Sequence, residues 1–217
     1  MGNRDPLDFI DYIRDNQDKF WELFNQHMTL VAWAVVISII IALPLAILTS
    51  RVKALQKPMT WISNIGQATP SLAVLAIMLP VMGVGFRPSL FALTILAILP
   101  IFLNTLVGIQ SVDAATIDAA RGMGASDFQV LRMVELPLAV PFMFAGIQTA
   151  VVQSIAMATL AAYIGGGGFG DWILQGLAVR NFPILLAGAV PVAVLAMLAE
   201  IIMGQIRRML IPKGLTV

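Results

Sequence analysis

The chain has 217 residues, of which 59% are hydrophobic and 12% charged, and its formal net charge is +1. Soluble domains carry about twice that share of charge, and nucleic-acid binding needs a basic face that this balance does not supply. The absence of cysteine excludes disulfides and thiolate chemistry. The single histidine, His27, has no second histidine or acidic neighbour with metal-ligand spacing, so we expect it to lie at a membrane interface.

The first 27 residues form a polar but patterned N-terminal segment, 1–27. Between Arg4 and Gln26, apolar side chains recur at helical spacing while acidic residues and Arg14 occupy the other face. This pattern predicts an amphipathic helix that lies on a surface, such as that of a bilayer. The segment lacks the apolar core of a cleavable signal peptide.

Long uncharged stretches follow, and a membrane-spanning helix needs about 20 predominantly apolar residues. Three of them are long enough for one span each, a fourth is long enough for a span and a loop, and a fifth opens the last span. The sequence therefore predicts an all-α integral membrane protein with about five spans, a transmembrane domain over 28–210 and a short tail over 211–217. In chain order the stretches are Met28 to Ser50, Pro58 to Phe86, Pro88 to Val112, Leu136 to Gly170 and Asn181 to Ala199.

The distribution of charge predicts the orientation of these spans. The N-terminal segment is mainly acidic, whereas the connection after the first span holds Arg51, Lys53 and Lys57 without an acid. Short segments rich in lysine and arginine stay in the cytoplasm. We therefore expect the N-terminus outside and the tail inside. Five spans then place 83–88 outside, 113–137 inside, and the glycine-rich stretch after Tyr163 outside.

Residues 113–137 are the longest well-patterned polar stretch between two predicted spans. A short helix can begin near Asp113, and Gly122 and Gly124 favour a turn at its end. Ser126 and Gln129 fit the S-x-x-Q capping box of a second helix. Pro137 then marks the entry to the fourth span, so we expect a helix, a glycine turn and a helix on the cytoplasmic surface.

This stretch resembles the cytoplasmic signature of permease subunits in binding-protein-dependent ABC importers. That signature is EAA, three residues, glycine, nine residues, isoleucine, any residue, and Leu-Pro. The chain preserves every interval, with aspartate for glutamate and valine for isoleucine as its two departures. The resemblance implies that this segment couples the permease to an ATPase through Asp118, Ala119, Ala120, Gly124, Val134, Leu136 and Pro137.

A wider resemblance covers nearly the whole chain after residue 28. Residues 68–88, 119–150 and 158–171 are similar to the osmoprotectant branch, whose members import glycine betaine, carnitine, choline or proline betaine. It implies the type I importer fold, in the plasma membrane of a bacterium. It also implies three kinds of partner: a second permease subunit, identical or homologous; two ATPase subunits that hold ATP and Mg²⁺; and an extracytoplasmic binding protein.

Other functions have less support in the residues. Gly165, Gly167 and Gly170 satisfy G-x-G-x-x-G, but no strand precedes them, so a flexible outer loop is the better interpretation. No G-x-x-x-x-G-K-[ST] occurs, so we expect no nucleotide, cofactor or catalytic site on this chain. A carrier driven by protons or sodium would need ionisable groups near the midplane. It remains an alternative, as does an ABC permease for another solute such as an amino acid.

Few polar groups lie within the predicted spans. They are candidates for the substrate pathway, although each can equally form a hydrogen bond between helices. Glu200 lies near the cytoplasmic end of the last span, where we expect a paired or snorkelling acid rather than a proton carrier. The pathway candidates are Gln67, Asn104, Gln148 and Gln153.

Overall fold

A computed structural model describes residues 8–210, and within that range the chain is helical and has no strand. Four stretches are long and apolar enough to cross a membrane. The expected all-α fold is confirmed. The tail 211–217 and residues 1–7 lie outside the described residues. The four stretches are α2 (Gln17–Arg51), α5 (Phe86–Gln110), a continuous helical stretch over 127–158, and α10 (Phe182–Leu210).

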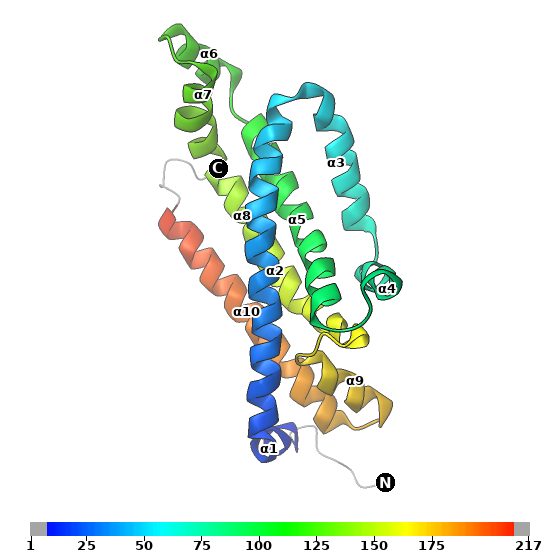
Figure 1. Ribbon diagram of the computed structural model, residues 1–217. Coiled ribbons are helices and arrows are strands. Elements are labelled where there is room, and N and C mark those ends of the chain that lie inside the picture. The colour runs from blue at the N-terminus through cyan, green and yellow to red at the C-terminus, as the bar shows by residue number, and fades with distance from the viewer. Residues whose placement is uncertain (1–7, 211–217) are drawn as a thin grey trace.

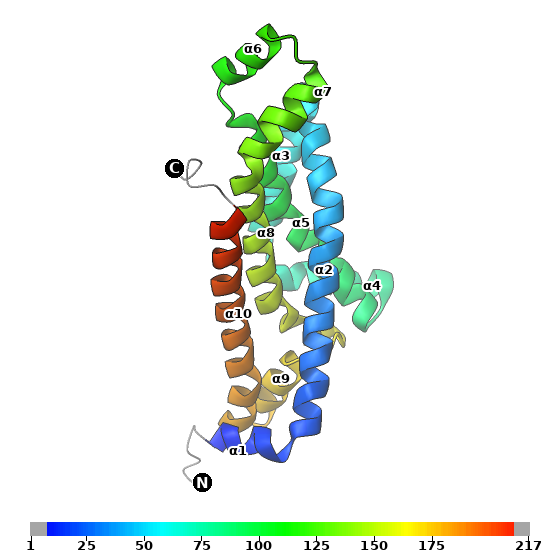
Figure 2. The same ribbon diagram turned by 90° about the vertical axis from the view of Figure 1, so that its left-hand side faces the viewer.

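The second predicted span is bent. α3 (Lys53–Ala68) and α4 (Ser71–Met82) meet at a break and differ in direction by 97°. The break falls at Thr69 and Pro70, because proline disfavours helical geometry in the residue before it. The stretch expected to form the second span, 58–86, is therefore a bent pair of helices rather than one continuous helix. α4 projects sideways from the bundle (Figure 2). Counting the bent pair as one crossing gives five.

α5 is the central helix, and α2 and α8 (Leu136–Ala158) pack against it. Glycine allows the close approach of α8. A side chain at Gly146 would lie 2.8 Å from the carbonyl oxygen of Pro100, and one at Gly108 would lie 2.6 Å from Cβ of Phe142. Small residues at such contacts let helix backbones approach closely.

The N-terminal segment differs from the expected single surface helix. α1 (Asp8–Asp15) ends at a turn at Asn16, and the rest of the amphipathic stretch is the first part of α2. Its apolar face packs inside the protein, where Leu23 is fully buried. His27 is also buried, at 1% exposure, and its Nε2 donates to the carbonyl oxygen of Ile155 at 3.0 Å. The side chain of His27 is therefore enclosed by protein, whereas the sequence led us to expect it at a membrane interface.

The glycine-rich stretch is packed rather than loose. It lies between the 3₁₀ turn η2 (Leu160–Ile164) and α9 (Gly170–Ala178). Gly165, Gly167 and Gly168 have φ between 72° and 83°, which favours glycine. Gly168 donates its backbone N–H to Oε1 of Gln26 at 2.9 Å. The expectation of a flexible loop was therefore wrong.

The bundle is elongated and has two distinct ends. α1 and α9 lie together at one end, and α6 (Ala114–Gly122) and α7 (Asp127–Val130) form the other (Figures 1 and 2). We call these the α1/α9 end and the α6/α7 end. The connection between α2 and α3 belongs to the α6/α7 end, because Arg51 pairs there with Glu135. This matches the expectation that the basic segment after the first span and residues 113–137 lie on one side.

Candidate functional site

α6 ends in a Schellman motif. The N–H of Gly124 donates to the carbonyl of Arg121 at 2.9 Å, and the N–H of Ala125 donates to the carbonyl of Ala120 at 3.1 Å. Gly124 has φ of 88°, a conformation that glycine adopts without steric cost. The glycine turn expected from the sequence is present, and Gly124 is the residue that makes it.

The second helix of this segment begins with the expected capping box. Gln129 N–H donates to Oγ of Ser126 at 3.4 Å, and Ser126 N–H donates to Oε1 of Gln129 at 2.8 Å. Arg121 of α6 also pairs with Asp127 at 3.0 Å, with both side chains more than half exposed. The Schellman motif, the capping box and this ion pair thus all restrain the position of α6 relative to α7.

The segment continues into the membrane helix without a break. The expected second helix is present as α7, but it passes through a π-helical turn, η1 (Leu131–Glu135), directly into α8. Pro137 lies in the first turn of α8, directly after η1. Val134 and Leu136 are half-buried at this junction. Residues 127–158 thus form one continuous helical stretch.

The two alanines of the signature face different ways. Asp118 and Ala119 are exposed, whereas Ala120 is 6% exposed and packs inside the segment, as does Val130. A partner can therefore contact Asp118 and Ala119 but not Ala120. The large apolar side chains of Met123, Phe128 and Met133 are exposed by 84%, 68% and 71% at the same end. Exposed apolar side chains on a polar segment are typical of protein contacts.

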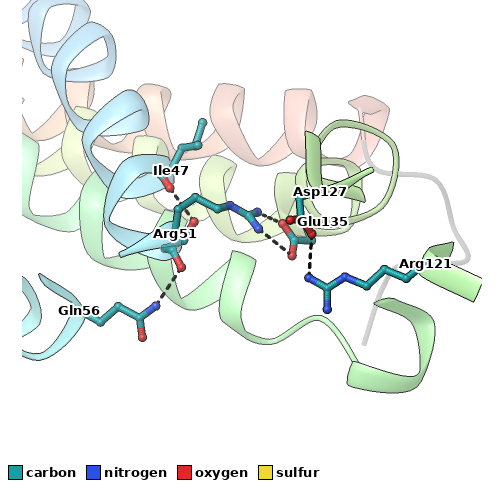
Figure 3. Close-up of polar contacts among 7 residues, drawn as sticks. Ile47, Arg51, Gln56, Arg121, Asp127 and Glu135 are labelled. Atoms are coloured by element: carbon teal, nitrogen blue, oxygen red, sulfur yellow. Dashed lines mark hydrogen bonds and ion pairs between the residues drawn. The ribbon is translucent and has the colours of Figure 1, made fainter. Parts of the chain in front are cut away.

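A partly buried ion pair links this segment to the bundle. The guanidinium of Arg51 faces the carboxylate of Glu135 with both terminal nitrogens, and Nη1 donates to Oε1 at 3.3 Å (Figure 3). The Glu135 side chain is only 8% exposed. Sequence inspection missed this pair, because the two residues are 84 positions apart.

The four pathway candidates are not gathered into one site. Asn104 of α5 donates to the carbonyl of Pro100 in its own helix at 2.8 Å. Gln148 of α8 donates to Glu200 of α10 at 2.7 Å, so Glu200 is paired, as expected for a structural acid. Gln67 and Gln153 are exposed on α3 and α8. Any pathway through them therefore has to form along the surface of this chain.

An open hollow of about 340 Å³ lies between α3 and α5 near the α6/α7 end, and none of the four candidates lines it. Its α3 side carries polar residues at helical spacing. The polar positions 56, 60 and 64 follow helical spacing, and Gln67 continues the series. This periodicity in the sequence could have indicated the polar face of α3. The lining residues are Gln56, Lys57, Thr60, Trp61, Asn64 and Gln110.

Within residues 8–210, no three side chains of histidine, aspartate or glutamate gather in a way that could hold a metal ion.

Comparison with protein families identifies the class. Residues 22–212 match the family described as binding-protein-dependent transport system inner membrane component, and the chain belongs to this family. It is 39% identical over 204 residues to the carnitine transport permease protein OpuCD of Listeria monocytogenes, covering 94% of this chain and 92% of that protein. It is 37% identical to the glycine betaine/carnitine/choline transport system permease protein OpuCB of Bacillus subtilis, covering 94% of each.

A third relative has nearly the same length. The osmoprotectant import permease protein OsmW of Salmonella typhimurium is 36% identical over 214 residues, with 96% of this chain and all of that protein covered. Among solved structures, the MetNI methionine ABC transporter in an inward-facing conformation matches with a TM-score of 0.79 and 20% identity. The match covers 91% of this chain and 99% of that one. A second match, an amino acid ABC transporter with histidines, has a TM-score of 0.75 and 19% identity, covering 95% and 99%. These two matches establish the fold of ABC importer permeases.

Proposed function

We propose that this chain is the permease subunit of an ABC importer that moves a small compatible solute of the betaine, carnitine or choline type into the bacterial cytoplasm. The observation that carries the substrate class is the 36–39% identity, over more than nine tenths of the chain, to relatives named for carnitine, glycine betaine, choline or osmoprotectants. The chain itself is non-catalytic, and ATP with Mg²⁺ is held by a pair of partner ATPase subunits. A binding protein delivers the solute, and a second permease subunit completes the pathway.

The α6/α7 end is the proposed docking surface for the ATPase. α6 offers the exposed Asp118 and Ala119, and the turn after it offers Met123. The Schellman turn and the capping box hold these side chains in a fixed arrangement. A preorganised surface loses less conformational entropy on binding, which favours a stable docked complex.

Transport assays test the function. The complex of this chain with its ATPase and binding protein, reconstituted in liposomes, should accumulate labelled glycine betaine, carnitine or choline only when ATP is present on the ATPase side. Methionine serves as the control solute, because the MetNI match extends to the fold alone. Uptake of methionine but of none of the three would move the assignment to an amino-acid importer. Accumulation by this chain without the ATPase, driven by a proton or sodium gradient, would support a secondary carrier.

Substitutions in the turn test the docking surface. Gly124→Val should lose ATPase association, because valine is strained at φ of 88°. Gly122→Val is the matched control, since Gly122 lacks a positive φ and has open space around it. Ala119→Trp should also weaken association. Ala120 is not suitable for this test, because a large side chain at that buried position would disrupt the segment itself. Normal pull-down of the ATPase by both Gly124→Val and Ala119→Trp would contradict docking at this end.

Cysteine labelling tests the orientation. The natural chain has no cysteine, so each introduced thiol is unique. Asp15→Cys and Met123→Cys place exposed thiols at the two ends. In intact cells, a membrane-impermeant maleimide should label the first and not the second. Equal labelling of both, or labelling of Met123→Cys alone, would contradict an N-terminus outside.

A further inference from the structure

The ion pair between Arg51 and Glu135 differs from the three other ion pairs within the described residues. Those three join positions three to six residues apart, and their side chains are roughly half exposed or more. Arg51 and Glu135 are 84 residues apart, and their side chains are 35% and 8% exposed. Exposed pairs contribute little to stability, whereas a buried carboxylate is costly without its partner. This pair is therefore a specific link between two distant elements.

Glu135 lies in an unusual turn. It is the last residue of η1, and the backbone bond from Leu136 to the carbonyl of Leu131 has the i→i+5 spacing of a π-helix. Such a turn adds one residue to the helix, and one residue corresponds to about 100° of rotation. The turn therefore sets the faces that α7 and α8 present relative to each other, and it directs the carboxylate inward toward Arg51 (Figure 3).

Arg51 lies at a second junction. It is the last residue of α2, and α3 begins two residues later, after the extended residue Val52. A cation at a helix C-terminus is favoured by the helix dipole. Gln56 of α3 donates to the carbonyl of Ser50 at 2.9 Å, which ties the start of α3 to the end of α2 (Figure 3). The guanidinium also lies within electrostatic range of Asp127 and Arg121.

We propose that Arg51 and Glu135 are positioning residues for energy coupling. The proposal rests on the proposed docking of the ATPase at the α6/α7 end. Movement of α6 and α7 reaches α8 through the continuous helix, but α2 and α3 have no covalent connection to that segment nearby. The ion pair passes the same movement to the junction of α2 and α3, so that three spans respond together. Without the pair, the ATPase still binds and hydrolyses ATP, but α2 and α3 do not follow the movement of α6 and α7.

The test uses the complete transporter in liposomes and measures uptake per ATP hydrolysed. Arg51→Gln and Glu135→Gln should each lower this ratio by roughly fivefold or more, in the range found for residues that couple distant sites. Membrane levels and ATPase pull-down should stay at wild-type values. Arg14→Gln, which breaks an exposed pair with Asp11, is the matched control and should leave the ratio unchanged.

The double variant Arg51→Gln/Glu135→Gln decides the matter even if a single variant folds poorly, because it leaves no unpaired buried charge. It should insert normally and still lose coupling. Its fall in uptake per ATP should be no larger than that of the more impaired single variant, because both changes remove the same interaction. A wild-type ratio in the double variant overturns the proposal, as does a loss equal to the product of the single losses. Failure of the docking model is distinct: it would appear as no ATPase pull-down by the wild-type chain.

Discussion

The two ends of the bundle are built on different principles. At the α1/α9 end, Phe169 is fully buried and its ring lies 5.3 Å from that of Phe20, while Trp172 packs against Tyr12 at the same centroid distance. At the α6/α7 end, Met123 and Phe128 are exposed and the links are ionic or capping contacts. The first end has a core of packed aromatic side chains, although Trp21 and Phe182 are exposed there. The second presents exposed apolar groups beside ionic and capping contacts, which suits a surface that a partner covers.

The largest expected effect comes from matched substitutions of one phenylalanine at each end. Phe169→Ala should lower the free energy of unfolding by about 3–5 kcal/mol, because it empties a fully buried aromatic site. Phe128→Ala should change it by less than about 0.5 kcal/mol. Thermal unfolding in detergent measures both.

Binding should show the opposite order. Phe128→Ala should weaken ATPase association on the order of tenfold, as expected for an aromatic residue in an interface. Any Phe169→Ala protein that folds should bind normally. Equal stability losses in the two variants would contradict the contrast between the ends.

A smaller effect concerns the local order of the α6/α7 end. Ser126→Ala removes one half of the capping box, which should cost about 1 kcal/mol locally. Backbone hydrogen exchange at Gln129 should then be about fivefold faster, while exchange at the α1/α9 end stays unchanged. Thr116→Ala, at an exposed hydroxyl residue of α6, is the control. Unchanged exchange at Gln129 would mean that tertiary packing, rather than the cap, orders this helix.

The sequence predicted features that depend on neighbouring residues. Ser126 and Gln129 lie three positions apart and form their capping box, and the turn expected at Gly122 and Gly124 forms at Gly124. Hydropathy alone could not locate the 97° bend, since α3 and α4 together are apolar enough to count as one span. Pro70 offered a signal, because proline disfavours a helical residue before it.

Features that depend on distant residues were missed. The partner of Glu135 is 84 residues away, and no periodicity of the sequence indicates it. The inward direction of Ala120 depends on the fold of the whole α6–α7 turn, so the signature did not reveal which alanine a partner can reach. The packed glycine stretch resembled a flexible loop, since its contacts come from α2, at Gln26.

The smallest expected effect is a pH dependence at the α1/α9 end. Burial raises the pKa of Asp171, in the first turn of α9; nearby Lys19 opposes the shift, and Glu22 adds to it. An acid with a raised pKa in the folded state binds its proton more tightly there than when unfolded. Its contribution to stability is therefore present below the ordinary aspartate pKa of about 3.9 and is lost as the pH rises through the raised value.

Asp171→Asn removes this titration, so its stability relative to the wild type should increase as the pH rises across that window. The difference should stay below about 0.5 kcal/mol, because the side chain is only half-buried. Unfolding temperatures between pH 3 and pH 7 measure this difference. Asp15→Asn, at an exposed carboxylate of the same end, is the control for the effect of losing one charge. A relative stability that falls with rising pH would mean that Lys19 holds the ionised carboxylate more strongly than burial disfavours it. The surroundings of Asp171 would then be more solvated than the packing of the α1/α9 end indicates.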